Sequence, residues 1–205
     1  MTSRQKLIAT IASVSVVLVL LGSTALVGWQ MFMKRSDSGI ARAAANALPI
    51  PAAKLASRPV LYRDFVKSRD TLKKFLASPA AQEQGMNVPF NAELEKNALE
   101  KLLVQKALEE LAEQRNVTVT EEELRQYYSE VLSATSSTTP DVGTYLLDTF
   151  GWNEEDFRQN VLKPALLEQR LSLILSQEQS GDPEALNRYI DERLKQPDVV
   201  RYVRF

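Results

Sequence analysis

The sequence predicts a mainly α-helical protein with a small two-stranded sheet, carried behind a single N-terminal transmembrane helix. Three observations support this fold class. The chain holds a long uncharged run near its start, apolar residues at helical spacing through its middle, and a strand-like alternation at its end. We therefore expect a transmembrane anchor over residues 1–33, a linker over residues 34–51 and a helical domain over residues 52–205.

The composition argues against catalysis and against nucleic-acid binding. The formal net charge is −1, so no basic surface is expected to attract a phosphate backbone. Histidine and cysteine are both absent. This removes His-based triads, imidazole and thiolate metal ligands, and disulfides. We expect no catalytic residue, no cofactor and no metal site, and the composition therefore argues against an enzyme.

The uncharged run from Leu7 to Phe32 is the predicted contact with a lipid bilayer. A helix needs about 20 apolar residues to cross the hydrocarbon core, and this run is long enough to cross with some tilt. Trp29 lies near its end, where amphipathic rings favour the interface. A cleaved signal peptide has a shorter apolar region and a small-residue site directly after it. An uncleaved anchor is the favoured interpretation; a cleaved signal and a buried helix are the alternatives.

Basic residues flank both ends of this run, so charge alone gives only a weak orientation. We favour a cytoplasmic N-terminus, which places the rest of the chain outside the cytoplasm. The linker ends in Leu48-Pro-Ile-Pro51, where proline disfavours helix in the residue before it. We expect it to be a spacer.

The helical domain is predicted to open with a short strand over Ala52–Ser57, followed by a helix that ends at Ser78-Pro79. Residues 80–89 lack a clear period, contain Gly85 and are expected to form a loop. The helix is indicated by the spacing of Val60, Phe65, Leu72, Phe75 and Leu76, and the loop region carries the apolar residues Met86, Val88 and Phe90.

The stretch Asn91–Leu132 is the centre of the predicted domain. Asn91 is a favourable N-cap, and helical spacing then continues to about Asn116. Residues 117–119 are an extended link rich in β-branched side chains. Thr120-Glu-Glu-Glu123 is a predicted capping box that starts a second helix, so the two helices form a hairpin.

The remaining helices are predicted from their caps. Ser133–Gly143 is a polar loop, and Thr139-Pro140 is a plausible N-cap and first residue of a short helix ended by Gly151. Asn153 caps a longer helix, in which Pro164 should cause a bend. Asp182-Pro183 caps the last helix, which runs to about Lys195.

Residues 199–205 alternate like a strand and need a partner, because a lone strand is unstable. The candidate is Ala53–Ala56. We predict that the two pair and so join the start of the domain to its end.

Three motifs resemble the N-terminal domain of the SurA family of envelope chaperones, which includes the membrane-anchored PpiD and PrsA types. The family's opening A-x-V-N-G-x-x-I-x-x-x-x-F is similar to Ala53–Phe65, with Ala56-Ser57 in place of Asn-Gly. Its G-V-x-V-[ST]-x-x-E-[LV] link is similar to Asn116–Leu124, the nearest match. Its F-G-[WL]-[ST]-x-x-x-[FY]-R-x-x-[VI] segment is similar to Phe150–Val161. The resemblance covers roughly residues 52–205 and implies the helical chaperone domain of that family.

In those proteins a parvulin-type prolyl isomerase domain is inserted after or within the helical unit, with an active site that commonly uses histidine. Here only one helix and a strand follow the bent helix, and histidine is absent. The resemblance therefore implies the chaperone half alone, without isomerase activity. It also implies a single-pass protein of the bacterial cytoplasmic membrane with an extracytoplasmic domain.

The favoured functional hypothesis is a membrane-tethered chaperone, or holdase, whose partners are unfolded or nascent polypeptides. An apolar crevice between helices would accept client segments. The candidate client-binding residues are Phe65, Phe75, Met86, Phe90, Tyr128, Tyr145, Phe150 and Trp152. For each of them, an ordinary place in the core is the alternative.

Two further hypotheses remain open at this point. The chain could be an envelope scaffold or assembly subunit that docks on one dedicated partner. It could also be an enzyme that uses the carboxylates of residues 121–123 and 154–156. Both carboxylate clusters lie at predicted helix starts, where negative charge complements the helix dipole, and this structural explanation is favoured.

Overall fold

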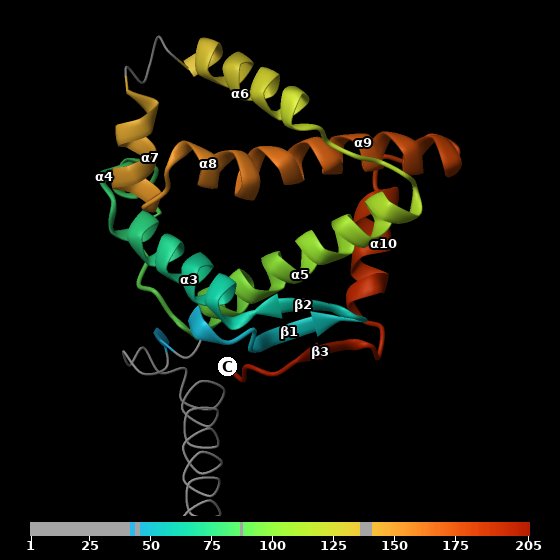
Figure 1. Ribbon diagram of the computed structural model, residues 1–205, viewed down its shortest axis with the longest axis horizontal. Coiled ribbons are helices and arrows are strands. Elements are labelled where there is room, and N and C mark those ends of the chain that lie inside the picture. Colours follow the sequence, from blue (N-terminus) through green and yellow to red (C-terminus); the bar gives the residue numbers. More distant parts are fainter. Residues whose placement is uncertain (1–41, 44–45, 87, 136–140) are drawn as a thin grey trace, which may run out of the picture.

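Three short strands form the base on which the helices stand (Figure 1). The computed structural model describes residues 42–43, 46–86, 88–135 and 141–205. The predicted membrane-spanning run therefore lies outside the described residues. Among the residues that are described, no helix is long and apolar enough to cross a membrane.

The sheet joins the start of the domain to its end, as predicted. Strand β1 (Pro51–Leu55) pairs antiparallel with β3 (Val199–Arg201), and Ala53 lies opposite Arg201. Beyond β3 the chain stays attached, since the Tyr202 amide donates to the Ala52 carbonyl at 2.9 Å. The predicted pairing of the domain's opening strand with the strand near the end of the domain is confirmed.

The two-stranded prediction was wrong, because a third strand, β2 (Arg58–Leu61), lies on the other side of β1. The sequence analysis placed Val60 in the following helix, which begins only at Tyr62. Pro59 argues against a central strand, but β2 is an edge strand, where proline is tolerated. The turn between β1 and β2 holds Ala56 at φ 51°, a conformation that favours Gly or Asn.

Helix α3 (Tyr62–Ala77) ends at Ser78, which at once caps a further short helix, α4 (Pro79–Glu83). The Ser78 hydroxyl accepts from the Ala81 amide, and Pro79 occupies the first helical position, as is common. The prediction that residues 80–89 form a loop was therefore wrong for residues 80–83, which belong to α4. Ser78-Pro79 both ends one helix and begins the next.

Helix α5 (Ala92–Gln114) has the ends that its sequence predicts. The Leu94 amide donates to Asn91 Oδ1 at 3.0 Å, so Asn91 is the N-cap. At the other end Asn116 has φ 54°, and the Val117 amide donates to the Ala112 carbonyl at 2.8 Å. This is the Schellman arrangement that ends many helices.

Helix α6 (Glu121–Thr135) starts in the predicted capping box. The Glu123 amide donates to Thr120 Oγ1 at 3.2 Å, and the Thr120 amide donates to Glu123 Oε2 at 2.8 Å. Helix α7 (Val142–Phe150) is capped by Asp141, and the expected cap at Thr139 lies outside the described residues. Helix α6 ends at Thr135, so it extends into the segment Ser133–Gly143, which was predicted to be a loop.

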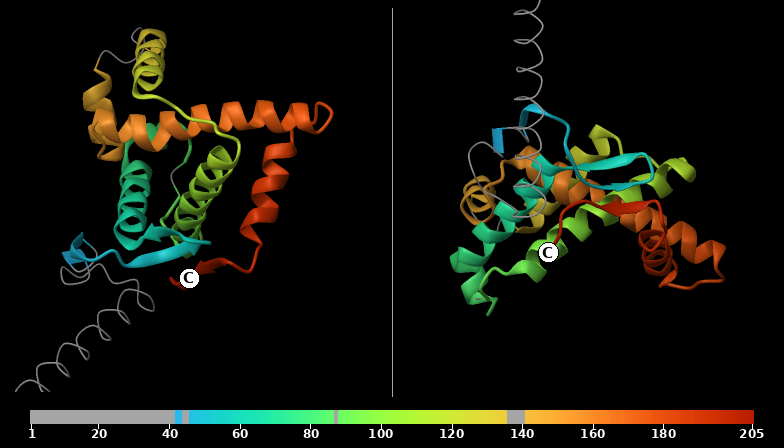
Figure 2. Two further views of the ribbon diagram at one scale, coloured as in Figure 1. Left: turned by 45° about the vertical axis from the view of Figure 1, so that its right-hand side comes forward. Right: turned by 90° about the horizontal axis from the view of Figure 1, so that it is seen from below.

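The last part of the chain forms a long rod and a returning helix. The rod consists of α8 (Glu154–Phe157), a π-helical turn η1 (Arg158–Leu162) and α9 (Lys163–Glu178). Helix α10 (Ala185–Leu194) then leads back to β3 (Figure 1). In Figure 2, α3 and α5 rise from the sheet and the rod spans their far ends.

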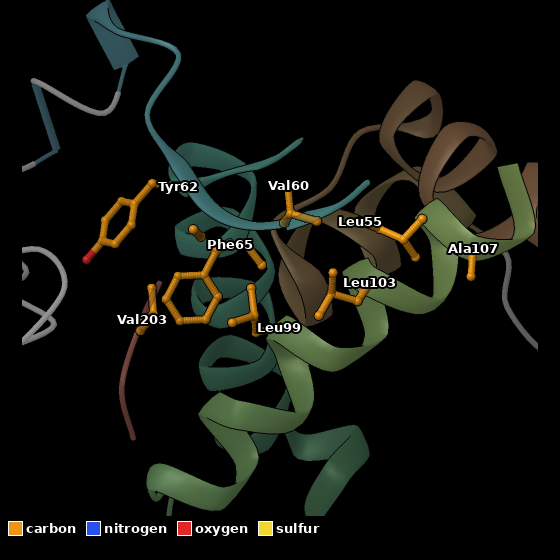
Figure 3. Close-up of a cluster of buried hydrophobic side chains, with 10 residues drawn as sticks. Leu55, Val60, Tyr62, Phe65, Leu99, Leu103, Ala107 and Val203 are labelled. Carbon is orange, nitrogen blue, oxygen red and sulfur yellow. The ribbon is translucent and has the colours of Figure 1, made fainter. Parts of the chain in front are cut away.

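The main core lies between the sheet, α3 and α5. Phe65 points between Leu99 of α5 and Val203 from the end of the chain (Figure 3), and its side chain is fully buried. A second cluster joins α5 to α9 and α10 through Leu111, Leu171 and Leu186. These two cores fix the positions of α3, α5 and the rod, which together form the walls of the cavity described next.

Candidate functional site

A cavity of about 760 Å³ lies between α3, α5 and the rod, and we call it the central cavity. Its walls are one face of α3, one face of α5, and the rod from Gln159 to Leu167. Phe150 and Trp152, at the end of α7 and just after it, close one side. This volume lies within the usual range of ligand pockets.

Helix α5 serves both the core and the cavity because it carries two apolar faces. Leu99 and Leu103 are buried in the main core, Leu94 and Ala98 line the cavity, and Leu102 lines the cavity while it also packs against the main core. The two sets are displaced by one residue along the sequence, and consecutive helical residues point about 100° apart. An apolar band this wide exceeds what packing on the sheet alone requires.

An aromatic stack forms the most distinctive part of the cavity wall. The rings of Phe75 and Phe150 stack with centroids 5.4 Å apart and planes inclined by 6°. Trp152 stacks on Phe150 at 5.1 Å and 24°. All three residues line the cavity, and all are only partly buried. The stack thus offers aromatic surface to whatever enters.

The backbone at Gly151 directs Trp152 to this position. Gly151 has φ 72°, and the Trp152 amide donates to the Leu146 carbonyl at 3.2 Å, which turns the chain back on α7. The indole Nε1 then donates to Thr71 Oγ1 of α3 at 2.9 Å. Directly afterwards, Asn153 and Asp156 form a reciprocal capping box that starts the rod.

Pro164 produces a π-helical turn in the rod where the sequence predicted a bend. Proline has no N–H, so it cannot donate to the Asn160 carbonyl as a residue at that helical position normally does. The turn η1 ends two residues before Pro164, and the side chain of Gln105 on α5 donates to the Asn160 carbonyl at 3.4 Å. Gln105, Asn160 and Pro164 all line the cavity. The wall therefore contains a backbone carbonyl, that of Asn160, which accepts a long hydrogen bond from a side chain of the facing helix.

Ionisable groups surround the apolar wall. Lys67 on α3 lies 2.5 Å from Asp156 Oδ1, and this hydrogen bond holds the pKa of Asp156 below its usual range. Lys106 pairs with Glu109 one helical turn further along α5 at 2.7 Å. Each of these pairs places at least one charged side chain at the cavity.

Three of the eight predicted client-binding residues line the central cavity together: Phe75, Phe150 and Trp152. Tyr145 contacts this group edge-on, at 6.2 Å from the Phe150 ring, and is 39% exposed. The structure therefore gathers half of the predicted set around one aromatic stack.

The other four predicted residues lie elsewhere. Phe65 is fully buried in the main core, and Tyr128 packs in a third cluster with Leu124. Met86 is exposed on the segment after α4, and Phe90 lies beneath the Lys73 ammonium group. Phe65 and Tyr128 are core residues, which is the alternative that the sequence analysis left open.

The sequence analysis missed the contributions of α5 and the rod. The separation of α3 from the rod, which opens the cavity, depends on tertiary packing that no local pattern encodes. One sequence signal did indicate that the rod belongs to the site. Pro164 lies within a strongly helical pattern, where it interrupts the series of backbone hydrogen bonds. A π-helical turn lies next to it, and such turns are frequent at functional sites.

A family model described as the SurA-like N-terminal domain matches residues 2–172. This span covers the sheet's first two strands, helices α3 to α8 and the greater part of α9. No curated protein and no solved structure matches the chain.

Proposed function

This chain belongs to the SurA-like N-terminal domain family, and from that premise we propose that it is a chaperone that binds unfolded or nascent polypeptide segments in its central cavity. We further propose that residues 7–32 tether it to the bacterial cytoplasmic membrane, with the domain on the extracytoplasmic side. The role is binding without catalysis.

The aromatic stack at the cavity is the observation that carries this proposal. Phe75, Phe150 and Trp152 present ring faces and edges in a hollow of about 760 Å³. Burial of apolar side chains there is non-directional and scales with the area removed from water, so it suits many different client sequences. A chaperone needs this tolerance, whereas an enzyme needs a fixed arrangement of reacting groups.

The rod adds a contact that does not depend on the client's side chains. The Asn160 carbonyl can accept from a client amide, and the Gln105 side chain, now bound to that carbonyl at 3.4 Å, can donate to a client carbonyl. When a protein binds an extended peptide, main-chain hydrogen bonds supply affinity, and side-chain pockets supply the preference for particular residues. Both kinds of contact are available on adjoining walls here.

The predicted tether supports this function by keeping the cavity near emerging chains. Attachment to the same membrane raises the local concentration of a client segment without any new contact. Modest intrinsic affinity is then sufficient, and a client leaves when its apolar residues become buried in its own core.

Suppression of aggregation by the full chain tests the proposal. The full chain, purified in a mild non-ionic detergent, should reduce light scattering by an unfolded client diluted from urea. Ser68→Phe on α3 and Asn97→Trp on α5 fill the cavity from two different walls and should weaken this effect. Ser129→Phe, on an exposed position of α6, is the matched control and should not.

The variants must first melt like the wild-type protein. A folded wild-type chain that leaves scattering unchanged would refute the chaperone function and favour a subunit that docks on one dedicated partner. Equal loss of the effect in Ser68→Phe and Ser129→Phe would show that clients bind outside the cavity.

A further inference from the structure

We infer that the central cavity prefers client segments in which acidic residues flank the apolar anchor. This inference rests on the proposed function and specifies the class of segment that is bound. It is carried by the charges on the cavity walls, which differ in sign from the charge of the chain as a whole.

The cavity lining carries an excess of positive charge. Four of its residues are lysines, Lys67, Lys101, Lys106 and Lys163, and two are carboxylates, Asp64 and Glu109. The excess is therefore two positive charges, whereas the complete chain has a formal net charge of −1. The lysines come from three separate elements, so the excess does not result from one basic segment.

Two of the four lysines already have partners. Lys67 pairs with Asp156 across the gap between α3 and α8, and Lys106 pairs with Glu109. For Lys101 on α5 and Lys163 on the rod, no ion pair is formed within the part of the chain that the structure describes. These two ammonium groups are the ones available to a ligand.

The size of the cavity places these charges close to a bound anchor. A volume of about 760 Å³ corresponds to roughly 9 Å across, which is about three residues of extended chain at about 3.3 Å per residue. A client with one aromatic or aliphatic side chain on the Phe150–Trp152 wall therefore has its neighbouring residues in or beside the cavity that Lys101 and Lys163 also line. Carboxylates at those neighbouring positions would pair with the two lysines.

The same charges act against basic segments. A client lysine or arginine near the anchor would face two unpaired ammonium groups, and juxtaposed like charges reduce affinity. Specificity is a difference between affinities, so repulsion of one class contributes as much as attraction of another. The aliphatic stems of Lys101 and Lys163 can still cover the apolar part of the client while their charged ends stay hydrated.

Three fluorescent ten-residue peptides test this inference. All carry the same central Leu-Phe-Leu core, flanked by Glu, by Gln or by Lys, and binding to the full chain in non-ionic detergent is followed by fluorescence anisotropy. We expect the Glu peptide to bind about fivefold tighter than the Gln peptide, as two partly exposed ion pairs would give, and the Lys peptide to bind weakest. Raising the salt from about 0.05 M to about 0.5 M should shrink the difference.

A double variant assigns the preference to the two lysines. Lys101→Gln with Lys163→Gln should remove the difference in affinity between the Glu and Gln peptides. The matched control is Lys96→Gln with Lys195→Gln, two exposed lysines that do not line the cavity, and it should keep the preference.

The outcomes separate the two proposals. If the Gln peptide binds but the Glu peptide binds no better, the charge preference is wrong while the cavity remains a client site. A preference that survives in the Lys101/Lys163 variant also overturns the inference. If none of the three peptides binds, the proposed function fails and the inference fails with it.

Discussion

Phe75 and Phe150 stack nearly parallel, with ring centroids 5.4 Å apart, although they lie on different helices and far apart in the sequence. This contact holds the end of α7 against the end of α3, and the Lys74 ammonium group reinforces it by donating to the Leu147 carbonyl at 2.5 Å. Trp152 extends the stack into the central cavity. One aromatic contact therefore contributes both to the fold and to the candidate binding surface.

Phe150→Leu should separate these contributions. The substitution keeps an apolar side chain but removes two ring stacks, which should lower the free energy of unfolding by about 1–3 kcal/mol. Urea denaturation measures this change. Leu147→Ala, on the same helix at a position that is 56% exposed, is the control and should shift the midpoint little. Equal shifts in the two variants would show that the stack adds no stability.

Gly151→Ala tests the turn that directs Trp152. Gly151 has φ 72°, where an added Cβ costs about 1 kcal/mol, and that Cβ would lie 3.4 Å from Lys74 Cδ. Gly85→Ala is the matched control, because Gly85 has φ 69° but nothing within 4 Å of an added Cβ. Both variants should lose similar stability. Only Gly151→Ala should change Trp152 fluorescence, measured in a Trp29→Phe background; an unchanged spectrum would contradict this role.

Part of the fold follows from the sequence and part does not. The caps of α5 and α6 were predictable, because Asn91 and Thr120 satisfy helix amides by local contacts. The pairing of β1 with β3 was also predictable, since a strand-like chain end requires a partner. Strand β2 was missed because Pro59 is acceptable only at a sheet edge, and the edge is known only once the sheet order is known.

The candidate site was predictable only in its aromatic part. Phe75, Phe150 and Trp152 stand out as large apolar residues, but so does Phe65, which the structure buries. Whether an aromatic residue of α3 is buried in the core or lines the cavity depends on which face of α3 packs against α5. Gln105 and Asn160 could not have been linked from sequence, because their contact joins two helices across the cavity.

Acid should weaken the attachment of α6 to the rest of the domain. Arg170 of α9 donates to Glu123 Oε1 at 2.6 Å, and with the Thr120 amide it lowers the pKa of Glu123 from 4.5 to about 2. Because the folded-state pKa is depressed, this stabilisation is fully present above about pH 4.5. It is lost as the pH falls towards 2.

Glu123→Gln should therefore reduce the loss of stability between pH 5 and pH 2, measured by urea denaturation at several pH values. The control is Glu93→Gln, an exposed carboxylate in the first turn of α5 that forms no ion pair among the described residues. If both variants follow the wild-type pH dependence, the pairing of Glu123 with Arg170 does not affect stability.

Deletion of residues 199–205 should strongly destabilise the domain. It removes the pairing of β1 with β3, the buried Val203 side chain and the edge contact of Phe205 on Phe65. Loss of these contacts should lower the free energy of unfolding by at least about 3 kcal/mol, seen as a lower thermal midpoint. Arg204→Ala, an exposed position in the same segment, should leave the midpoint unchanged. A truncated chain that melts like the wild type would show that this pairing is dispensable.

Site-specific photocrosslinking tests most directly whether clients enter the central cavity. A small alkyl-diazirine amino acid, close in size to methionine and so too small to fill the cavity, replaces Asn97, which is exposed at the cavity wall, or Lys96, its exposed neighbour that does not line the cavity. The full chain is irradiated with an unfolded client diluted from urea. We predict client crosslinks from position 97 and few from position 96, with the position 97 crosslinks reduced by Ser68→Phe. Equal crosslinking from both positions, or none from position 97, would contradict binding in the cavity.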